Sequence, residues 1–305
     1  MEPGIAYFWP TASAELVEFA KHNGWVTVRE MTNRTMAAAK LTLDGAFAKA
    51  GEERPHHISQ ARVDEELAVL PTFDFVFSSN EDVDRSLLSA GVEESRILKS
   101  TFGWAERRFG SQSSEVTNKG SLTVGYLGMI SIGKGVKDLI DGWKAWPGDG
   151  KLRLAGPLDW SMEDDVKALV ASDPRVELHG YVEDIEAFYR SCDVLVVPTL
   201  DEGGPQVTYE MGAVGAAIIA TPMAKARMLV DGRNALIVAE HSPTAIREAL
   251  SRLATDVELR SQIGRQAKLD VQKFSYAHVG KERAEMLLNR VKALRSAASV
   301  SSQSR

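Results

Sequence analysis

The sequence predicts an α/β protein in which one complete, doubly wound Rossmann-like domain is preceded by a partial Rossmann-like domain. Three observations predict this class. The length of 305 residues suits about two domains. Short apolar runs alternate with amphipathic stretches along most of the chain. The composition, 44% hydrophobic and 26% charged, is that of an ordinary globular protein.

The second half of the chain carries the alternation most regularly. We expect strands at 122–128, 152–156, 176–180, 194–198, 216–220 and 235–238. Several of these runs are apolar throughout, which is typical of parallel strands covered by helices on both faces. Trp143, Trp146 and Tyr189 fit the apolar stripes of the intervening helices, and Cys192 is expected to be a small buried residue. This part therefore predicts a complete doubly wound domain.

The first part of the chain reads as less than a full domain. We expect strands at 5–8, 25–28, 73–77 and 96–99, and helices at 13–22, 33–50, 59–70 and 80–90. Ser79 or Asn80 would cap the last of these helices. The predicted organisation is a partial domain over 1–115, with a polar linker at 111–120, and a complete domain over 116–275. A final helix over 276–295 would pack back toward the first domain, followed by a disordered tail over 296–305.

Charge and cysteine content exclude some classes of function. The chain has 42 acidic and 36 basic residues, a net charge of -6, so nucleic acid is not an expected partner. The single Cys192 allows no intrachain disulfide and fits a reducing, cytoplasmic location. No apolar run approaches the roughly 20 residues of a membrane helix. Four basic residues and no acid lie within 290–305, which leaves open a weak contact with the inner membrane face beside the alternative of a solvated tail.

The first chemical motif is GMISIGKG, residues 128–135, which follows a predicted strand and precedes a predicted helix. Glycines let the backbone approach a ligand, and a helix N-terminus together with Lys134 would suit a diphosphate. The spacing of Gly128, Gly133 and Lys134 approaches that of a P-loop, but Gly135 stands where that motif needs a hydroxyl for magnesium. A plain turn with a solvated lysine is the structural alternative.

The second motif is DEGGPQVTYE, residues 201–210, which follows another predicted strand. Gly203 and Gly204 would leave backbone amides accessible, and Pro205 suits the first turn of a helix. Two carboxylates around such a helix entry can bind vicinal hydroxyls, as one carboxylate does in dinucleotide sites. A pair of solvated glutamates is the alternative.

With these motifs in place, residues 122–295 resemble the donor-binding half of a retaining glycosyltransferase of family four (glycosyl transferases group 1), which has the two-domain GT-B fold. The family's glycine and Lys-Gly pair match Gly128 and Lys134-Gly135. Its two glutamates, which have seven residues between them in the chain, match Glu202 and Glu210. The segment TPMAKARMLVDGRNALIV resembles a further family segment.

The resemblance implies a role for each matched residue. Lys134 would bind the donor diphosphate, and Glu202 would accept hydrogen bonds from the donor sugar; these two are the expected catalytic residues. Glu210 would hold the ribose, and Tyr181 and Val182 would border the base. The remaining donor-binding residues would be Gly128, Gly133, Gly135, Gly203, Gly204 and Pro205. No metal and no cofactor are expected, because the nucleotide sugar is a substrate and cationic and amide groups would neutralise its diphosphate.

Two departures from the family pattern accompany the resemblance. Met129 stands where many members have arginine. The family's opening strands and acceptor loop have no counterpart before Met1, so the first domain is expected to be truncated, which leaves open a partner chain that covers it.

The leading hypothesis is a metal-independent retaining hexosyltransferase acting on an acceptor in polysaccharide or glycolipid biosynthesis. Its alternatives are a nucleotide-sugar-binding remnant or partner-dependent subunit and, third, a P-loop phosphotransferase.

Overall fold

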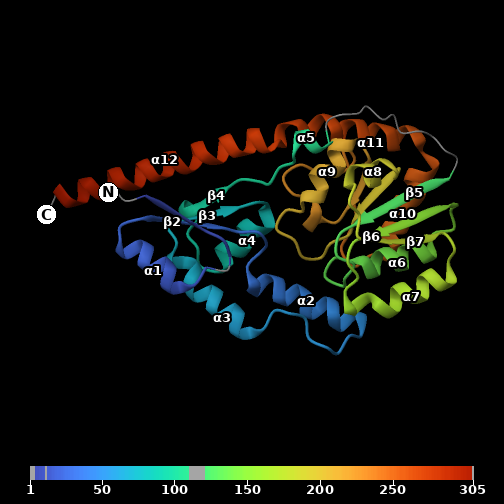
Figure 1. The fold of residues 1–305 in the computed structure, drawn as a ribbon, viewed down its shortest axis with the longest axis horizontal. Helices are drawn as coiled ribbons and strands as arrows, with labels where there is room; N and C mark the ends of the chain where they lie inside the picture. The colour runs from blue at the N-terminus through green and yellow to red at the C-terminus, as the bar shows by residue number, and fades with distance from the viewer. Residues whose placement is uncertain (1–3, 11, 110–120, 304–305) are drawn as a thin grey trace.

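The computed structural model describes residues 4–10, 12–109 and 121–303, so the predicted linker at 111–120 lies outside the described residues. Within the described ranges the chain forms two parallel sheets, one of four strands and one of six. Each sheet carries its own helices, and the two resulting domains lie beside each other (Figure 1). The predicted α/β class is therefore confirmed.

The first domain is built on the smaller sheet, whose strands lie side by side in chain order. Its strands are β1 (Ile5–Phe8), β2 (Val26–Glu30), β3 (Phe75–Ser78) and β4 (Ile97–Lys99), and its helices are α1 (Ala14–His22), α2 (Met36–Ala50), α3 (Gln60–Val69) and α4 (Glu81–Ser89). Asn80 caps α4 by accepting a hydrogen bond from the Val83 amide at 2.8 Å, as the sequence predicts. Helix α2 begins later than expected because Thr35 caps it.

The second domain is built on the larger sheet, with strand order β10-β9-β8-β5-β6-β7. Its strands are β5 (Leu122–Leu127), β6 (Gly150–Ala155), β7 (Val176–Gly180), β8 (Val194–Val197), β9 (Ala217–Ala220) and β10 (Leu236–Ile237). Its helices are α6 (Val136–Ala145), α7 (Glu163–Ser172), α8 (Ile185–Arg190), α9 (Gln206–Val214), α10 (Pro243–Thr255) and α11 (Val257–Asp270), and the short helix α5 (Glu106–Phe109) precedes the sheet. All six strands overlap their predicted positions.

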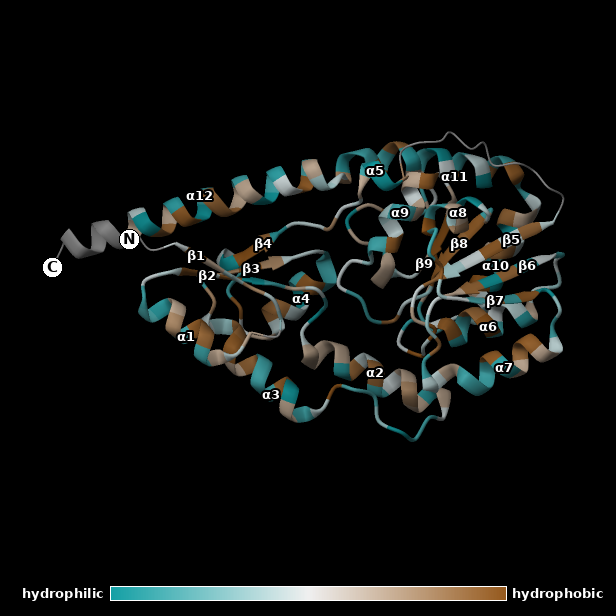
Figure 2. Ribbon diagram, in the orientation of Figure 1, coloured by the Kyte–Doolittle hydropathy of each residue, from teal (hydrophilic) through white to brown (hydrophobic). Residues whose placement is uncertain are grey.

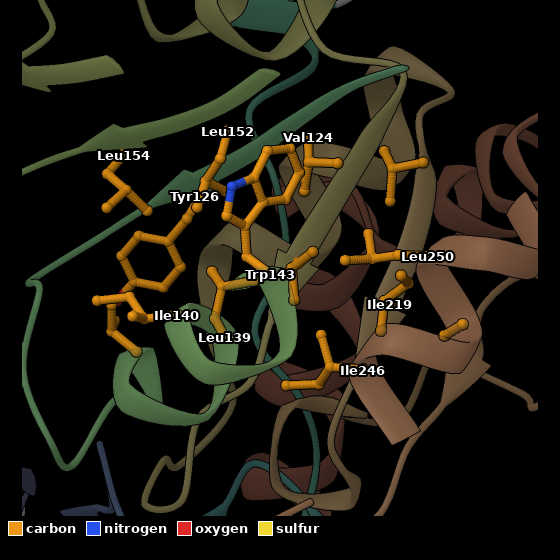
Figure 3. Packing of buried hydrophobic residues seen from close by; sticks show 14 of the residues in the cluster. Val124, Tyr126, Leu139, Ile140, Trp143, Leu152, Leu154, Ile219, Ile246 and Leu250 are labelled. Atoms are coloured by element: carbon orange, nitrogen blue, oxygen red, sulfur yellow. The ribbon is translucent and has the colours of Figure 1, made fainter. Parts of the chain in front are cut away.

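Helices cover the larger sheet on both faces. One core cluster joins the sheet to α6, α7 and α10, and a second joins it to α8, α9 and α11. Trp143 of α6 is fully buried in the first cluster, among side chains of β5, β6 and α10 (Figure 3). Tyr189 and Cys192 are buried in the second cluster. Hydrophobic residues dominate β8 and β9 (Figure 2), which are buried throughout, as expected for parallel strands covered on both faces, whereas the edge strand β7 exposes Leu178 and His179.

The last helix, α12 (Tyr276–Gln303), runs from the second domain along the first (Figure 1). Met286, Leu287 and Val291 pack against the apolar face of the smaller sheet. The helix extends through part of the stretch 296–305, where the sequence predicts a disordered tail. The sequence SAASVSSQ contains no glycine or proline, so no residue in it breaks the helix.

Candidate active site

A cavity of about 520 Å³ lies between the two domains, at the carboxyl ends of β5 and β8. These strands pair at the centre of the larger sheet, and the chain proceeds from them toward opposite edges. Parallel α/β sheets bind ligands at such a switch point. The lining residues are Trp9, Thr32, Phe102, Tyr126, Leu127, Gly128, Met129, Lys134, Val197, Thr199, Glu202, Gly204, Pro205, Gln206, Val207 and Tyr276. Both predicted motifs therefore contribute to one cavity.

The glycines of the loop after β5 have different structural roles. Gly128 lines the cavity and has a φ of 152°. Gly135 precedes α6 with a left-handed φ of 66°, and a Cβ there would collide with the carbonyl oxygen of Pro198 at the end of β8. Gly133 lies outside the cavity and packs beside Leu43 of the first domain. Glycine at position 135 therefore lets the β5 loop approach the end of β8.

Lys134 and Glu202 form an ion pair in the cavity wall. The Lys134 ammonium also donates to the carbonyl oxygen of Asp201 at 3.3 Å. The side chains of Lys134 and Glu202 are 30% and 21% exposed, so a ligand in the cavity can reach both. Burial raises the pKa of the neighbouring Tyr126 hydroxyl, and the negative charge of Glu202 adds to this shift. The cavity thus combines an accessible cation and carboxylate with an aromatic wall.

The loop after β8 leads directly into the cavity and then into α9. Gly204 and Pro205 line the cavity together with Gln206 and Val207 of the first helical turn. The sequence predicts Pro205 in the first turn of the helix, and the structure places it one position earlier, at the N-cap of α9. No side chain caps this helix. Its N-terminus therefore presents backbone amides and a partial positive charge to the cavity. Gly203 packs against the first domain and does not line the cavity.

Besides Gly133, Gly135 and Gly203, three further residues of the predicted donor site do not line this cavity. Glu210 on α9 accepts a hydrogen bond from the Tyr189 hydroxyl at 3.0 Å, and burial raises its pKa. It lies on the helix whose first turn, at Gln206 and Val207, lines the cavity. Burial raises the pKa of Tyr276 in the cavity wall, and the charge of Glu210 adds to this shift. Tyr181 is 84% exposed, and Val182 packs against the core of the second domain. The contacts of these residues with ribose and base stay predictions.

The first domain contributes lining residues that the sequence motifs did not identify. Trp9 and Thr32 follow the carboxyl ends of β1 and β2, and Phe102 follows β4. Tyr276, in the first turn of α12, completes this aromatic side of the cavity. The signal that could have found Trp9 is its position directly after a predicted strand, at the edge where parallel sheets bind ligands.

Within 4–10, 12–109 and 121–303 the structure shows neither a candidate metal site nor a candidate membrane-spanning helix. No group of three or more His, Cys, Asp or Glu side chains in these ranges is placed to hold a metal ion. No helix among the described residues is long and apolar enough to cross a membrane.

Both predicted motifs, residues 128–135 and 201–210, lie inside a region that is similar to a known protein family. Residues 121–256 match the family described as glycosyl transferases group 1. This group 1 region contains the β5 loop, the β8 loop and α9, and therefore most of the second-domain side of the cavity.

One relative and two solved structures extend the likeness beyond the group 1 region. The capsular polysaccharide biosynthesis glycosyltransferase CapM of Staphylococcus aureus is 27% identical over 73% of this chain. The chain spans 63% of the length of CapM, under two thirds. Anabaena Alr3699/HepE, solved in complex with UDP, has a TM-score of 0.75 at 16% identity over 93% of this chain and 78% of its own. Sucrose-phosphate synthase from Thermosynechococcus elongatus has a TM-score of 0.77 at 17% identity over 95% and 74%. These structures establish the GT-B fold.

Proposed function

We propose that this chain is a glycosyltransferase that uses a nucleoside diphosphate sugar as its donor. The observation that carries the proposal is the pair Lys134–Glu202 inside a cavity at the switch point of the larger sheet. Three further findings support it: the group 1 match, the glycosyltransferase name of CapM, and the UDP and UDP-glucose complexes of the structural neighbour HepE.

The accessible ion pair of Lys134 and Glu202 suggests how the donor would be held. A diphosphate brings negative oxygens that compete with Glu202 for the Lys134 ammonium, and such charge-assisted contacts are strong. Released from Lys134, the Glu202 carboxylate would accept hydrogen bonds from hydroxyls of the donor sugar. The uncapped N-terminus of α9 would add backbone donors on the same side of the cavity. Glu210, further along α9, would hold the ribose.

We further propose transfer of a hexose with retention at the anomeric carbon and without a metal ion. The bond between the anomeric carbon and the phosphate oxygen breaks while the acceptor oxygen attacks the same face of the sugar. The departing phosphate oxygen takes the acceptor proton. Lys134 and the α9 amides stabilise the negative charge that develops on the diphosphate. This stabilisation lowers the activation free energy of the transfer. The acceptor would enter on the first-domain side, along Trp9, Thr32 and Phe102.

The test is a donor panel of UDP-, GDP- and ADP-glucose, with the free diphosphates alongside. Calorimetry measures binding, and radiolabelled donors measure transfer to water or to added acceptors, with and without EDTA. Binding of one nucleotide with EDTA-resistant turnover is expected, and NMR of the product gives the anomeric configuration. Binding without turnover would favour a nucleotide-sugar-binding remnant. Absence of any nucleotide binding would overturn the proposal.

A further inference from the structure

Asp201, the residue before Glu202, is held by the first domain. Arg34 donates to its Oδ1 from Nε at 3.0 Å and from Nη2 at 2.7 Å, and Asn33 Nδ2 donates to its Oδ2 at 3.0 Å. The Asp201 side chain is 7% exposed and that of Arg34 is 12% exposed. Arg34 is itself fixed by a 2.9 Å hydrogen bond to Thr42 Oγ1 on α2. Both carboxylate oxygens of Asp201 are thus occupied by groups of the other domain.

The main chain of Asp201 is held from the cavity side. Its carbonyl oxygen accepts hydrogen bonds from Lys134 Nζ at 3.3 Å and from Thr199 Oγ1 at 3.2 Å. Lys134 and Thr199 both line the cavity. Asp201 therefore connects the first domain, through its side chain, with the donor side of the cavity, through its backbone.

The residue after Glu202 is also fixed by the first domain. The backbone of Gly203 lies so close to Thr32 and Asn33 that a Cβ at position 203 would collide with their main chain. One short segment of the first domain, residues 32–34, therefore contacts the β8 loop on both sides of Glu202. This loop has no helix or strand of its own, so these contacts hold the backbone on both sides of Glu202, whose carboxylate pairs with Lys134.

We propose that Asp201 is a positioning residue, and that Asn33 and Arg34 act through it to orient Glu202 toward the donor sugar. The first domain then sets the sugar selectivity of a donor site that belongs to the second domain. This inference rests on the proposed function, because it assigns the orientation of Glu202 in that same site. Holding a contact group within a fraction of an ångström is a general requirement for selective binding.

The chain provides a matched control in its other interdomain arginine–aspartate pair. Arg227 of the second domain donates from Nη2 to the two carboxylate oxygens of Asp84 on α4, at 3.0 and 2.9 Å. Its Nε donates to the Ser100 carbonyl oxygen at 2.6 Å. Neither Arg227 nor Asp84 lines the cavity. This pair also joins the domains, but it does not adjoin Glu202.

The experiment compares the double variants Arg34→Met/Asp201→Asn and Arg227→Met/Asp84→Asn with the wild-type chain. Each removes both charges of one pair, so neither leaves a buried ion unpaired. Calorimetry gives Kd for UDP, GDP and ADP and for their glucose esters. The readout is the ratio of the Kd of the ester to the Kd of the free diphosphate. We expect this ratio to rise about tenfold in the first variant and to stay unchanged in the second.

A double-mutant cycle with Glu202→Gln separates misplacement of Glu202 from general destabilisation of the chain. In the Arg34→Met/Asp201→Asn background, Glu202→Gln should cause little further rise in the ratio, because its carboxylate is already misplaced. If that background does not fold, as judged by thermal denaturation, Arg34→Lys takes its place, since lysine keeps the charge and loses the two-pronged contact. An unchanged ratio, or an equal rise in both double variants, would overturn the inference. If the wild type binds none of the six ligands, the proposed function fails, and this inference fails with it.

Discussion

Two carboxylate–cation pairs near the ends of strands differ in solvent exposure, and this difference separates a pair suited to ligand binding from a structural pair. Glu202 and Lys134 pair in the second domain, with side chains 21% and 30% exposed. Glu30, at the end of β2, pairs with Arg283 of α12, and these side chains are 3% and 16% exposed. An accessible pair can exchange its partners for ligand groups, whereas a buried pair that separates leaves each charge without its main compensation. The first pair therefore suits binding and the second joins α12 to the first domain.

The surroundings of the buried pair support this structural role. Tyr7 donates a hydrogen bond to Glu30, and the Arg283 guanidinium lies 4.0 Å from the centre of the Phe77 ring. Arg283 also donates to the carbonyl oxygen of Thr101 at 3.3 Å. Contacts from β1, β3 and the segment after β4 thus converge on one side chain of α12. This network lies on the face of the sheet that α12 covers.

The largest expected effect comes from Arg283→Met, which leaves Glu30 buried without its cation. Breaking a buried pair from one side costs about 3–5 kcal/mol, so we expect the free energy of unfolding to fall by that order. Chemical denaturation measures it. Arg265→Met is the matched control, because Arg265 and Glu258 are 62% and 81% exposed and such pairs contribute at most about 1 kcal/mol. Equal losses in the two variants would contradict the structural role of Arg283.

The next largest effect should be on binding. Lys134→Ala would remove the proposed charge-assisted contact to the diphosphate, worth about 1.5–3 kcal/mol. The Lys134 side chain is 30% exposed, so its loss should be tolerated by the fold. We therefore expect affinity for the free nucleoside diphosphate to fall roughly 10- to 100-fold with little change in unfolding. Calorimetry and thermal denaturation on the same sample measure both. Unchanged affinity would refute the assignment of Lys134.

The two pairs also show what the sequence could and could not predict. Apolar runs located the strands because burial on both faces requires continuous hydrophobic residues. Lys134 and Glu202 could be placed near each other because both follow predicted strands of one parallel sheet. The contact of Arg34 with Asp201 spans 167 positions of the chain and depends on how two domains pack, which no local pattern encodes. Trp9, in contrast, could have been assigned from its position directly after a predicted strand.

A smaller effect should separate the two glutamates of the second motif. Glu202→Gln should weaken binding of the sugar ester about tenfold and leave the free diphosphate nearly unaffected, because in the proposed site its carboxylate would face the sugar. Glu210→Gln should weaken both ligands, because both contain the ribose. Calorimetry with the free diphosphate and its ester measures the difference. If Glu202→Gln weakens the free diphosphate as much as Glu210→Gln does, the two roles are wrongly assigned.

The smallest effect concerns pH and the buried pair. Burial raises the pKa of Glu30 above its ordinary value of 4.5, and the charge of Arg283 only partly offsets this. The folded chain therefore holds the Glu30 proton more tightly than the unfolded chain. As pH rises above that ordinary value, deprotonation favours the unfolded state, so the contribution of Glu30 to the free energy of unfolding decreases.

Glu30→Gln removes this titration. The free energy of unfolding of this variant should therefore increase relative to that of the wild type as pH rises through this window. Denaturation series at several pH values measure the difference, with Glu258→Gln as an exposed control. A difference that is constant with pH would show that Arg283 and Tyr7 fully offset burial, and one that moves in the opposite direction would show that they outweigh it.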